Sequence, residues 1–293
     1  MTQFTGLGVA MITPFTQQDT VNFDAAERII EHLITNGTGA IVVLGTTGEP
    51  PTMNECEKTD MLKFTVDRVK GRVPVIAGCG CNCTTDTVQT ARHYEKLGAD
   101  GLLVVTPYYN KCTQEGLVAH YRAISDAVGV PIMAYNVPGR TNVNILPKTA
   151  LRLAELKNVR ALKEASGNID QLQEVLHLAG DRMDIYLGDD NLIFPGMCLG
   201  AKGVVSVVGN AVPQLISRLT GHLLKGEYEQ ARALNFSLLR IYKALFLEVN
   251  PIPVKWAMNY LGFEAGTPRL PLTALSEPYR AEVAAALDEL GSI

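Results

Sequence analysis

Short hydrophobic runs alternate with amphipathic stretches along the whole chain. The runs are rich in β-branched and other apolar side chains, so they predict strands. Eight such runs occur, at residues 8–13, 40–45, 73–78, 100–106, 131–136, 159–164, 184–188 and 202–208. Between them, apolar residues recur at helical spacing, for example at Leu117, Val118, Tyr121, Ile124 and Val128. Thr52 and Glu55 have the spacing of a capping box for the helix after the second run.

The strand–helix units repeat at intervals of roughly 25–30 residues, which predicts a (β/α)8 barrel, the α/β fold called the TIM barrel. We expect the barrel to occupy residues 1–212. Residues 213–293 show no further strand pattern and predict helices, including the last barrel helix, that continue the same structural unit. A doubly wound open sheet is the alternative, but no G-x-G-x-x-G sequence opens a first helix.

Composition and charge limit the classes of binding partner that we expect for this protein. The chain is 47% hydrophobic and 19% charged, as in ordinary globular proteins, and its net charge is −4. It has no Lys/Arg-rich run, so we expect no nucleic-acid partner. The start MTQFTGLGVAMITPF lacks the pattern of a signal peptide, and no apolar run approaches the ~18 residues of a membrane span. We therefore expect a cytoplasmic protein without a membrane partner.

Cysteine and histidine positions argue against a metal site. Cys79, Cys81 and Cys83 form a C-x-C-x-C sequence, but this is not a usual zinc spacing and no histidine adjoins it. We expect reduced thiols in a loop after a strand. The five histidines lie in predicted helices rather than at strand ends, at His32, His93, His120, His177 and His222. This placement argues against a His-based triad and against a His-rich metal site.

The sequence VRALKEASGN at 159–168 places Lys163 where the sixth strand should still be buried. Fully buried lysines are rare unless they are paired. Burial favours the neutral amine, which at the end of a barrel strand can attack a ketone and form a Schiff base. The alternative is an ion-paired lysine. Residues alternate across a strand, so Lys163 and Glu164 should face opposite sides and not pair directly.

Other candidate groups follow neighbouring strands. Tyr135 closes the fifth strand, where its phenol can pass protons or simply fill the top of the barrel. Arg140 in the same loop can clamp a carboxylate or remain solvated. Thr46 and Thr47 in GTTGE offer hydroxyl and backbone N–H groups to a small carboxylate, although turn geometry alone also explains this sequence. The residues by themselves leave these alternatives open.

The ordered motifs resemble the dihydrodipicolinate synthase family, within the pyruvate-dependent class I aldolases. They span nearly the whole chain: GVAMITPF, GTTGEP, TPYYN, YNVPGRT, LKEASG, GDD, GVVSV and NPIPVKWA. The resemblance implies a lyase that condenses pyruvate with L-aspartate semialdehyde to 4-hydroxy-tetrahydrodipicolinate, the first committed step of diaminopimelate and lysine biosynthesis. It implies no cofactor, only a covalent Lys163–pyruvate intermediate.

The resemblance also assigns the reacting groups. Lys163 would form the Schiff base, Tyr135 would shuttle protons, and Thr47 would be its relay. Tyr109 would be the third relay member, contributed by a neighbouring subunit. The smallest competent unit would then be a dimer, and the resemblance implies a homotetramer, a dimer of dimers.

The substrate-binding groups come from the same resemblance. Arg140 would bind the carboxylate of aspartate semialdehyde. Thr46 and the Thr47 backbone would bind the carboxylate of pyruvate, and Val205 would line the pyruvate pocket. The two aspartates of GDD, at 189–190, stay open between a structural role and a role in holding substrate.

Two alternative functions remain. N-acetylneuraminate lyase, or a related 2-keto-acid aldolase, resembles this sequence, but the lyase usually has a Ser–Thr pair where Thr46 and Thr47 stand. It also lacks the Gly139–Arg140–Thr141 segment, which favours the synthase. A non-catalytic protein that binds pyruvate or a sugar acid would be expected to lose the nucleophile or the relay.

A possible effector site departs from the pattern of lysine-inhibited relatives. Those relatives carry Ser, Ala and His at the start of the helix after G-T-T-G-E. The corresponding positions here are Pro50, Pro51, Glu55 and Lys58, whereas Asn82 and Tyr108 fit the pattern. We therefore expect weak or absent inhibition by lysine.

Overall fold

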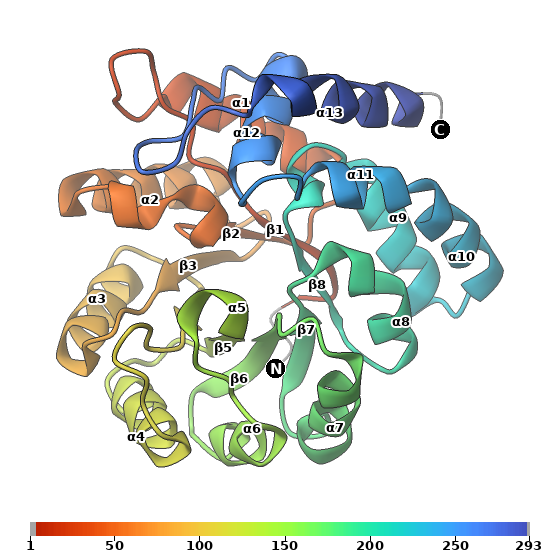
Figure 1. Cartoon of the computed structure of the whole chain (residues 1–293). Coiled ribbons are helices and arrows are strands. Elements are labelled where there is room, and N and C mark those ends of the chain that lie inside the picture. The colour runs from red at the N-terminus through yellow and green to blue at the C-terminus, as the bar shows by residue number, and fades with distance from the viewer. Residues whose placement is uncertain (1–3, 292–293) are drawn as a thin grey trace.

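All eight hydrophobic runs form strands, which pair in parallel in chain order and close into a barrel. The structure is a computed structural model and describes residues 4–291; Figure 1 views it along the barrel axis. The strands are β1 (Gly6–Ala10), β2 (Ala40–Val43), β3 (Val75–Cys79), β4 (Gly101–Val105), β5 (Ile132–Asn136), β6 (Val159–Glu164), β7 (Asp184–Leu187) and β8 (Gly203–Ser206). The predicted TIM barrel is thus confirmed.

Several strands are shorter than their hydrophobic runs. The first run continues to Thr13, but β1 ends at Ala10, after which the backbone N–H of Ile12 donates to Asn210 Oδ1 rather than to a strand. Ile12 and Thr13 are nevertheless fully buried. Hydrophobicity therefore predicted burial at this position correctly and strand pairing incorrectly. The sixth strand was predicted at its observed bounds.

Amphipathic helices surround the barrel. They are α1 (Phe23–Thr35), α2 (Glu55–Val69), α3 (Thr84–Lys96), α4 (Gln114–Ser125), α5 (Pro138–Thr141), α6 (Pro147–Ala154), α7 (Ile169–Ala179), α8 (Ile193–Cys198) and α9 (Pro213–Leu224). Four further helices follow: α10 (Tyr228–Ser237), α11 (Leu239–Ala244), α12 (Ile252–Tyr260) and α13 (Glu277–Leu290). The C-terminal helices predicted from the sequence are therefore present, and α13 packs against α11 and α12 (Figure 1). A boundary at residue 212 stays a prediction.

The start of α2 differs from the prediction. Asn54 caps the helix: its Oδ1 accepts from the Glu57 N–H at 2.9 Å, and Glu57 Oε2 accepts from the Asn54 N–H at 3.0 Å. The capping box predicted at Thr52 and Glu55 is wrong by two residues. Thr52 instead belongs to a short 3-10 turn, η2 (Pro50–Thr52), where its hydroxyl donates to the carbonyl of Glu49.

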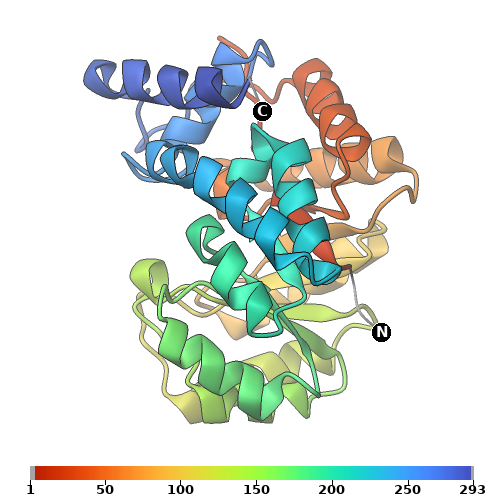
Figure 2. The same cartoon turned by 90° about the vertical axis from the view of Figure 1, so that its right-hand side faces the viewer.

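The interior of the barrel is a packed core that is closed at one end. Inward-facing side chains of several strands form it, among them Tyr135, Tyr186 and Val205. Phe4, just before β1, stacks on Tyr186 with ring centroids 4.3 Å apart, and the Tyr186 hydroxyl donates to the Phe4 carbonyl. In the turned view the chain enters β1 on the opposite side of the barrel from α5 (Figure 2). The open end is therefore the end where the strands terminate.

The structure also bears on whether the chain contains a membrane-spanning helix or a metal site. No helix between residues 4 and 291 combines the length and apolar character needed to cross a bilayer. Within the same residues, no group of three or more His, Cys, Asp or Glu side chains is arranged to hold a metal ion. The five histidines all lie on helices, as predicted.

Candidate active site

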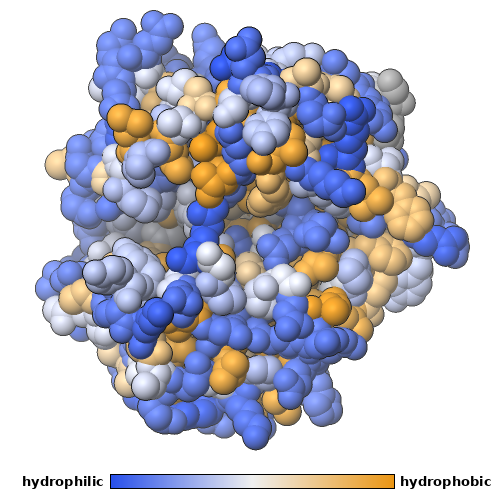
Figure 3. Space-filling model, viewed as in Figure 1, coloured by the Kyte–Doolittle hydropathy of each residue, from blue (hydrophilic) through white to orange (hydrophobic). Residues whose placement is uncertain are grey.

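A cavity of about 630 Å3 opens at the C-terminal ends of the strands. Figure 3 shows this face, which is largely hydrophilic and is hollowed near its centre. The cavity brings together six of the residues singled out in the sequence: Thr46, Glu55, Lys58, Tyr108, Tyr135 and Arg140. Lys163, Thr47 and Val205 do not line the cavity and are buried, with exposures of 4%, 2% and 0%. Lys163 lies against Tyr135 and Thr47 follows Thr46, and both of these neighbours line the cavity.

Lys163 lies on β6 beside Tyr135 on β5, where the two residues are register partners. Its Nζ lies 4.4 Å from the centroid of the Tyr135 ring. Glu164 faces the other way and accepts from Asn136 Nδ2 at 2.9 Å and from the Ser166 N–H at 2.8 Å. No ion pair with Lys163 occurs among residues 4–291. The predicted separation of Lys163 and Glu164 is confirmed, and Lys163 is a buried amine without a carboxylate partner in contact.

Gly188 packs closely against β6 and the residue that follows it. A Cβ atom at position 188 would lie 2.5 Å from Ala165 Cβ and 2.9 Å from Lys163 Cε, closer than such atoms approach one another. The glycine that precedes the two aspartates of the GDD motif is therefore required mainly by Ala165, and it also leaves space for the end of the Lys163 side chain.

The two aspartates of this motif have different surroundings. Asp190 is fully buried; it accepts from the Ser206 hydroxyl and from the N–H groups of Val207 and Val208, at 3.0 and 3.1 Å. Burial raises the pKa of both Asp189 and Asp190; at Asp189 the nearby charge of Lys163 opposes this rise, and at Asp190 the hydrogen bonds from Ser206, Val207 and Val208 oppose it most. Asp190 thus has a structural role: it fixes the turn after β8.

Thr46 and Thr47 lie in a 3-10 turn, η1 (Thr46–Gly48), directly after β2 and Gly45. The Thr13 hydroxyl donates to the Gly48 carbonyl at 2.7 Å and holds the end of this turn against the barrel. Thr46 lines the cavity, whereas the Thr47 side chain points into the protein and is almost fully buried. A turn of this kind presents backbone N–H groups that can bind a carboxylate.

Asn250 connects this turn to Arg140, and no role was predicted for it. Its Nδ2 donates to Thr47 Oγ1 at 3.0 Å, and its backbone carbonyl accepts from Arg140 Nη2 at 3.0 Å. Its Oδ1 is buried without a partner among the described residues, and Asn250 lines the cavity. In the sequence, only the NPIPVKWA motif drew attention to Asn250. No local pattern indicates its contact with Thr47, which lies 203 positions away.

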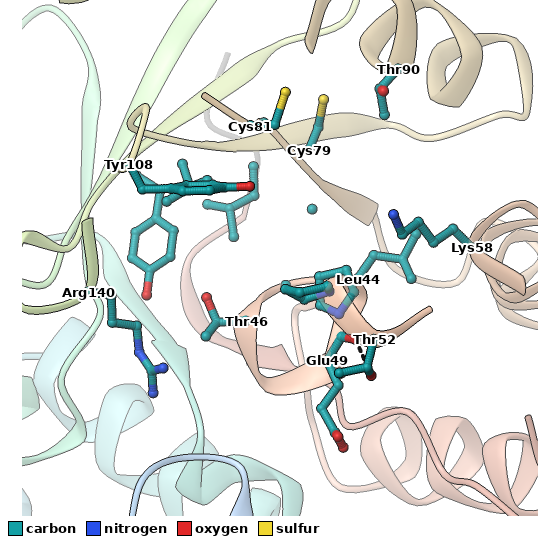
Figure 4. Close-up of a pocket in the computed structure, with 18 of the residues that line it drawn as sticks. Leu44, Thr46, Glu49, Thr52, Lys58, Cys79, Cys81, Thr90, Tyr108 and Arg140 are labelled. Carbon is teal, nitrogen blue, oxygen red and sulfur yellow. Dashed lines mark hydrogen bonds between the residues drawn. The ribbon is translucent and has the colours of Figure 1, made fainter. Parts of the chain in front are cut away.

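Arg140 lies on the short helix α5, and its guanidinium is exposed and directed toward the C-terminal segment (Figure 4). Tyr108 lines the cavity. Tyr109 does not: its side chain is 88% exposed, and its backbone has a left-handed φ of 74°. The single chain therefore does not bring Tyr109 to Tyr135.

Three of the possible effector residues, Glu55, Lys58 and Tyr108, line the same cavity. Tyr108 and Lys58 point into it from opposite sides (Figure 4). Lys58 Nζ forms an ion pair with Glu55 Oε1 at 2.8 Å. The fourth, Asn82, does not line the cavity, and its backbone carbonyl accepts from Asn110 Nδ2 at 2.9 Å. The cavity thus already contains an ammonium group of the protein itself, that of Lys58.

The thiols of Cys79 and Cys81 line the cavity on the side of Tyr108 (Figure 4). Cys79 is the last residue of β3 rather than a loop residue, because it still pairs with Val104 of β4. Burial raises the pKa of Cys79 to about 12, so its thiol stays protonated near neutral pH. Cys81, in the loop, donates to the Cys83 carbonyl at 3.2 Å. All six cysteines are free thiols.

Comparison with known proteins gives a consistent result. Residues 3–290 match the model of the dihydrodipicolinate synthetase family. The 4-hydroxy-tetrahydrodipicolinate synthase of Caldicellulosiruptor bescii is 50% identical over 291 residues, which cover 99% of this chain and 98% of that protein. Among solved structures, dihydrodipicolinate synthase from Thermotoga maritima superimposes with a TM-score of 0.97 at 43% identity, covering 99% and 100% of the two chains. The Acinetobacter baumannii enzyme, complexed with pyruvate, gives a TM-score of 0.96 at 40% identity, with 99% of each chain covered.

Proposed function

The chain belongs to the dihydrodipicolinate synthetase family, and we propose that it performs the reaction of this family through a Schiff base on Lys163. The protein is a lyase of the class I aldolase type. It condenses pyruvate with L-aspartate semialdehyde to 4-hydroxy-tetrahydrodipicolinate, in diaminopimelate and lysine biosynthesis. The observation that supports the assignment of Lys163 is its burial at the end of a barrel strand, beside Tyr135 and without a carboxylate in contact.

The reaction begins at the amine of Lys163. The neutral amine adds to the ketone carbon of pyruvate, and loss of water from the carbinolamine gives an iminium ion. The iminium draws electrons from the adjacent methyl carbon, which loses a proton and becomes a nucleophilic enamine. The enamine adds to the aldehyde of the second substrate, whose amine then closes the ring and releases Lys163. The protonated imine is itself the electron sink, so we propose that no cofactor takes part.

In the proposed reaction Tyr135 moves the protons of these steps. The contact of its ring with the amine of Lys163, 4.4 Å from Nζ to the ring centroid, supports this role because it brings a phenol into the same site. Thr47 Oγ1 accepts a hydrogen bond from Asn250, which leaves its own proton free to donate to the Tyr135 phenol. Together, Lys163, Tyr135, Thr47 and Asn250 form the chain's own part of the relay.

Tyr109 completes the relay only if a second copy of the chain supplies it. Of the aromatic side chains that the sequence associates with the site, it is the most exposed, and it lies outside the cavity of its own chain. A relay that uses Tyr109 therefore supports a dimer as the smallest active unit. We propose a homotetramer, a dimer of dimers, as the assembled form.

The two substrates bind at different depths of the cavity. The backbone of the Thr46–Gly48 turn, with the Thr46 hydroxyl, binds the carboxylate of pyruvate near Lys163. Val205, fully buried in the barrel interior, forms the floor of the pyruvate pocket. Arg140 is exposed at the rim and binds the carboxylate of aspartate semialdehyde, for which a guanidinium is well suited.

The alternatives from the sequence are less well supported. A lyase acting on N-acetylneuraminate would not need the Arg140 helix, which here reaches the cavity and contacts Asn250. A protein that only binds pyruvate would have no use for an unpaired buried amine, which lowers stability unless it serves a reaction.

Reductive trapping tests the proposal directly. We expect the protein, mixed with pyruvate and sodium borohydride, to gain one covalent pyruvate-derived adduct per chain, which peptide mapping places on Lys163. Protein treated with borohydride alone is the control. An adduct on a different lysine, or none on a folded sample, contradicts the role of Lys163. Adding aspartate semialdehyde or N-acetylmannosamine to the pyruvate-loaded enzyme then separates synthase from lyase.

A lysine titration tests the effector expectation. We expect millimolar L-lysine to leave the synthase rate nearly unchanged, because Lys58 already pairs with Glu55 in the cavity and this carboxylate is therefore not free to bind the ammonium group of an added lysine. The measurement is the initial rate at fixed pyruvate across a lysine series. Lys58→Ala is the matched variant and should bind lysine more strongly. Strong inhibition of the unmodified enzyme at low lysine concentration would contradict the expectation.

A further inference from the structure

A second buried lysine lies outside the proposed reaction. Lys255, on α12, is completely buried. Its Nζ donates to Glu49 Oε1 at 2.8 Å and to the Thr267 carbonyl at 3.3 Å, and it lies 4.1 Å from the centroid of the Phe15 ring. The Glu49 side chain is 1% exposed. Two opposite charges are therefore held in contact entirely away from water, which is uncommon in proteins.

Glu49 is the residue that ends the turn of Thr46 and Thr47. Its N–H donates to the Thr46 carbonyl at 3.2 Å, and its φ of 56° lies in the left-handed region. A side chain other than glycine adopts this conformation only where surrounding contacts hold it there. The Glu49 carboxylate makes those contacts, with Lys255 through Oε1 and with the Arg269 N–H through Oε2 at 2.9 Å.

The direction of the Glu49 side chain also indicates that its carboxylate makes contacts within the protein rather than in the cavity. In Figure 4 its carboxylate points away from Thr46 and away from the space between Tyr108 and Lys58. Glu49 therefore contributes backbone to the cavity, while its charge is directed into the C-terminal extension. The extension thus contacts the pyruvate-binding turn at two places, through the Glu49 carboxylate and through Asn250 on Thr47.

The other charges near Lys255 are already paired with one another. Arg269 also lies over the Phe15 ring, with its guanidinium carbon 4.1 Å from the centroid, and it forms ion pairs with Asp19 and Glu57. Burial lowers the pKa of Lys255 to about 8, and the Glu49 carboxylate opposes that change. At neutral pH the amine is mostly charged, and Glu49 is its partner in contact.

We propose that Lys255 is a positioning residue for pyruvate: through Glu49 it holds the Thr46–Gly48 turn in the geometry that binds the pyruvate carboxylate. This inference rests on the proposed function. Thr47 keeps a separate anchor, because its hydroxyl is bonded to Asn250. Arg140, which binds the second substrate, lies on α5 and has no contact with Glu49 among the described hydrogen bonds. Loss of Lys255 should therefore weaken pyruvate binding selectively.

The experiment is a kinetic comparison of Lys255→Met with the unmodified enzyme. Methionine keeps the length of the side chain and removes the amine. We expect the KM of pyruvate to rise about tenfold, since sub-ångström misplacement of binding groups has effects of this order. The KM of aspartate semialdehyde should stay within about twofold and kcat within about threefold. The pyruvate concentration for half-maximal borohydride trapping should rise in parallel with its KM.

Two further variants separate positioning from loss of stability. Glu49→Gln has nearly the same shape and should raise the KM of pyruvate in the same way, so it replaces Lys255→Met if the latter does not fold. Leu287→Ala removes a buried contact of α13 in the same extension, far from Glu49 in sequence, and should leave both KM values unchanged.

The outcomes are distinct. A folded Lys255→Met or Glu49→Gln enzyme with unchanged pyruvate KM overturns the positioning role, and so does an equal rise of both KM values. If the unmodified enzyme does not trap pyruvate on Lys163 at all, the proposed function fails instead, whatever the Lys255 variants do.

Discussion

Lys163→Ala is expected to lower kcat by at least about 10³-fold and to abolish the borohydride adduct, because alanine provides no amine for the ketone. Lys163→Arg should be equally inactive, since a guanidinium stays protonated and cannot act as a nucleophile. Initial rates of condensation and intact mass after trapping measure the two effects. The pocket around Lys163 is otherwise unchanged by the alanine, so the protein should remain folded.

The matched control is Lys202→Ala. Lys202 is exposed and lies just before β8, where its backbone N–H and carbonyl bond to neighbouring residues. Its replacement should leave rate and adduct unchanged. If Lys163→Ala retained more than about a tenth of the activity, the Schiff-base role would be untenable, because loss of a covalent nucleophile has a far larger effect. An adduct that moved to Lys255 would contradict that role equally.

Asp190→Ala is expected to lower the free energy of unfolding by about 3–5 kcal/mol, the range for breaking a buried charged network. The substitution leaves the Ser206 hydroxyl and the N–H groups of Val207 and Val208 without their acceptor inside the protein. The measurement is equilibrium unfolding in urea, with the midpoint and slope compared with those of the unmodified chain.

Asp190→Asn is the informative companion, because it keeps one acceptor oxygen and should lose less stability than the alanine variant. Asp181→Ala, at an exposed turn, controls for the loss of an aspartate and should change stability by no more than about 0.5 kcal/mol. A loss below about 1 kcal/mol for Asp190→Ala would show that the turn after β8 is held by other contacts.

The barrel could be predicted from the sequence because its determinants are local. Each strand is a short apolar run, and each helix shows its own periodicity, as the buried residues of α4 demonstrate. The position of Lys163 could be predicted for the same reason: it interrupts an apolar run, and alternation along β6 places it away from Glu164. The parallel order of the strands then brings Tyr135 next to it.

The contacts that depend on distant residues could not be predicted in this way. Asn250 meets Thr47 across 203 positions, and Lys255 meets Glu49 across 206. No hydrophobic pattern encodes such pairings, since they result from how the C-terminal extension packs on the barrel. The prediction of the residue that caps α2 was wrong for a local reason. Thr52 and Asn54 are both good capping residues, but Thr52 belongs to the 3-10 turn that begins at Pro50, so Asn54 caps the helix.

The stacking of Phe4 on Tyr186 bears on the side from which substrates reach the interior of the barrel. Phe4 packs against Tyr186 at the N-terminal end of the barrel, whereas the cavity of the described residues opens at the C-terminal ends of the strands. Lys163 is buried against Tyr135, which lines that cavity, and Arg140 is exposed at its edge. Under the proposed function both substrates therefore use the same opening, and pyruvate binds before aspartate semialdehyde because the enamine has to exist before the aldehyde can react with it.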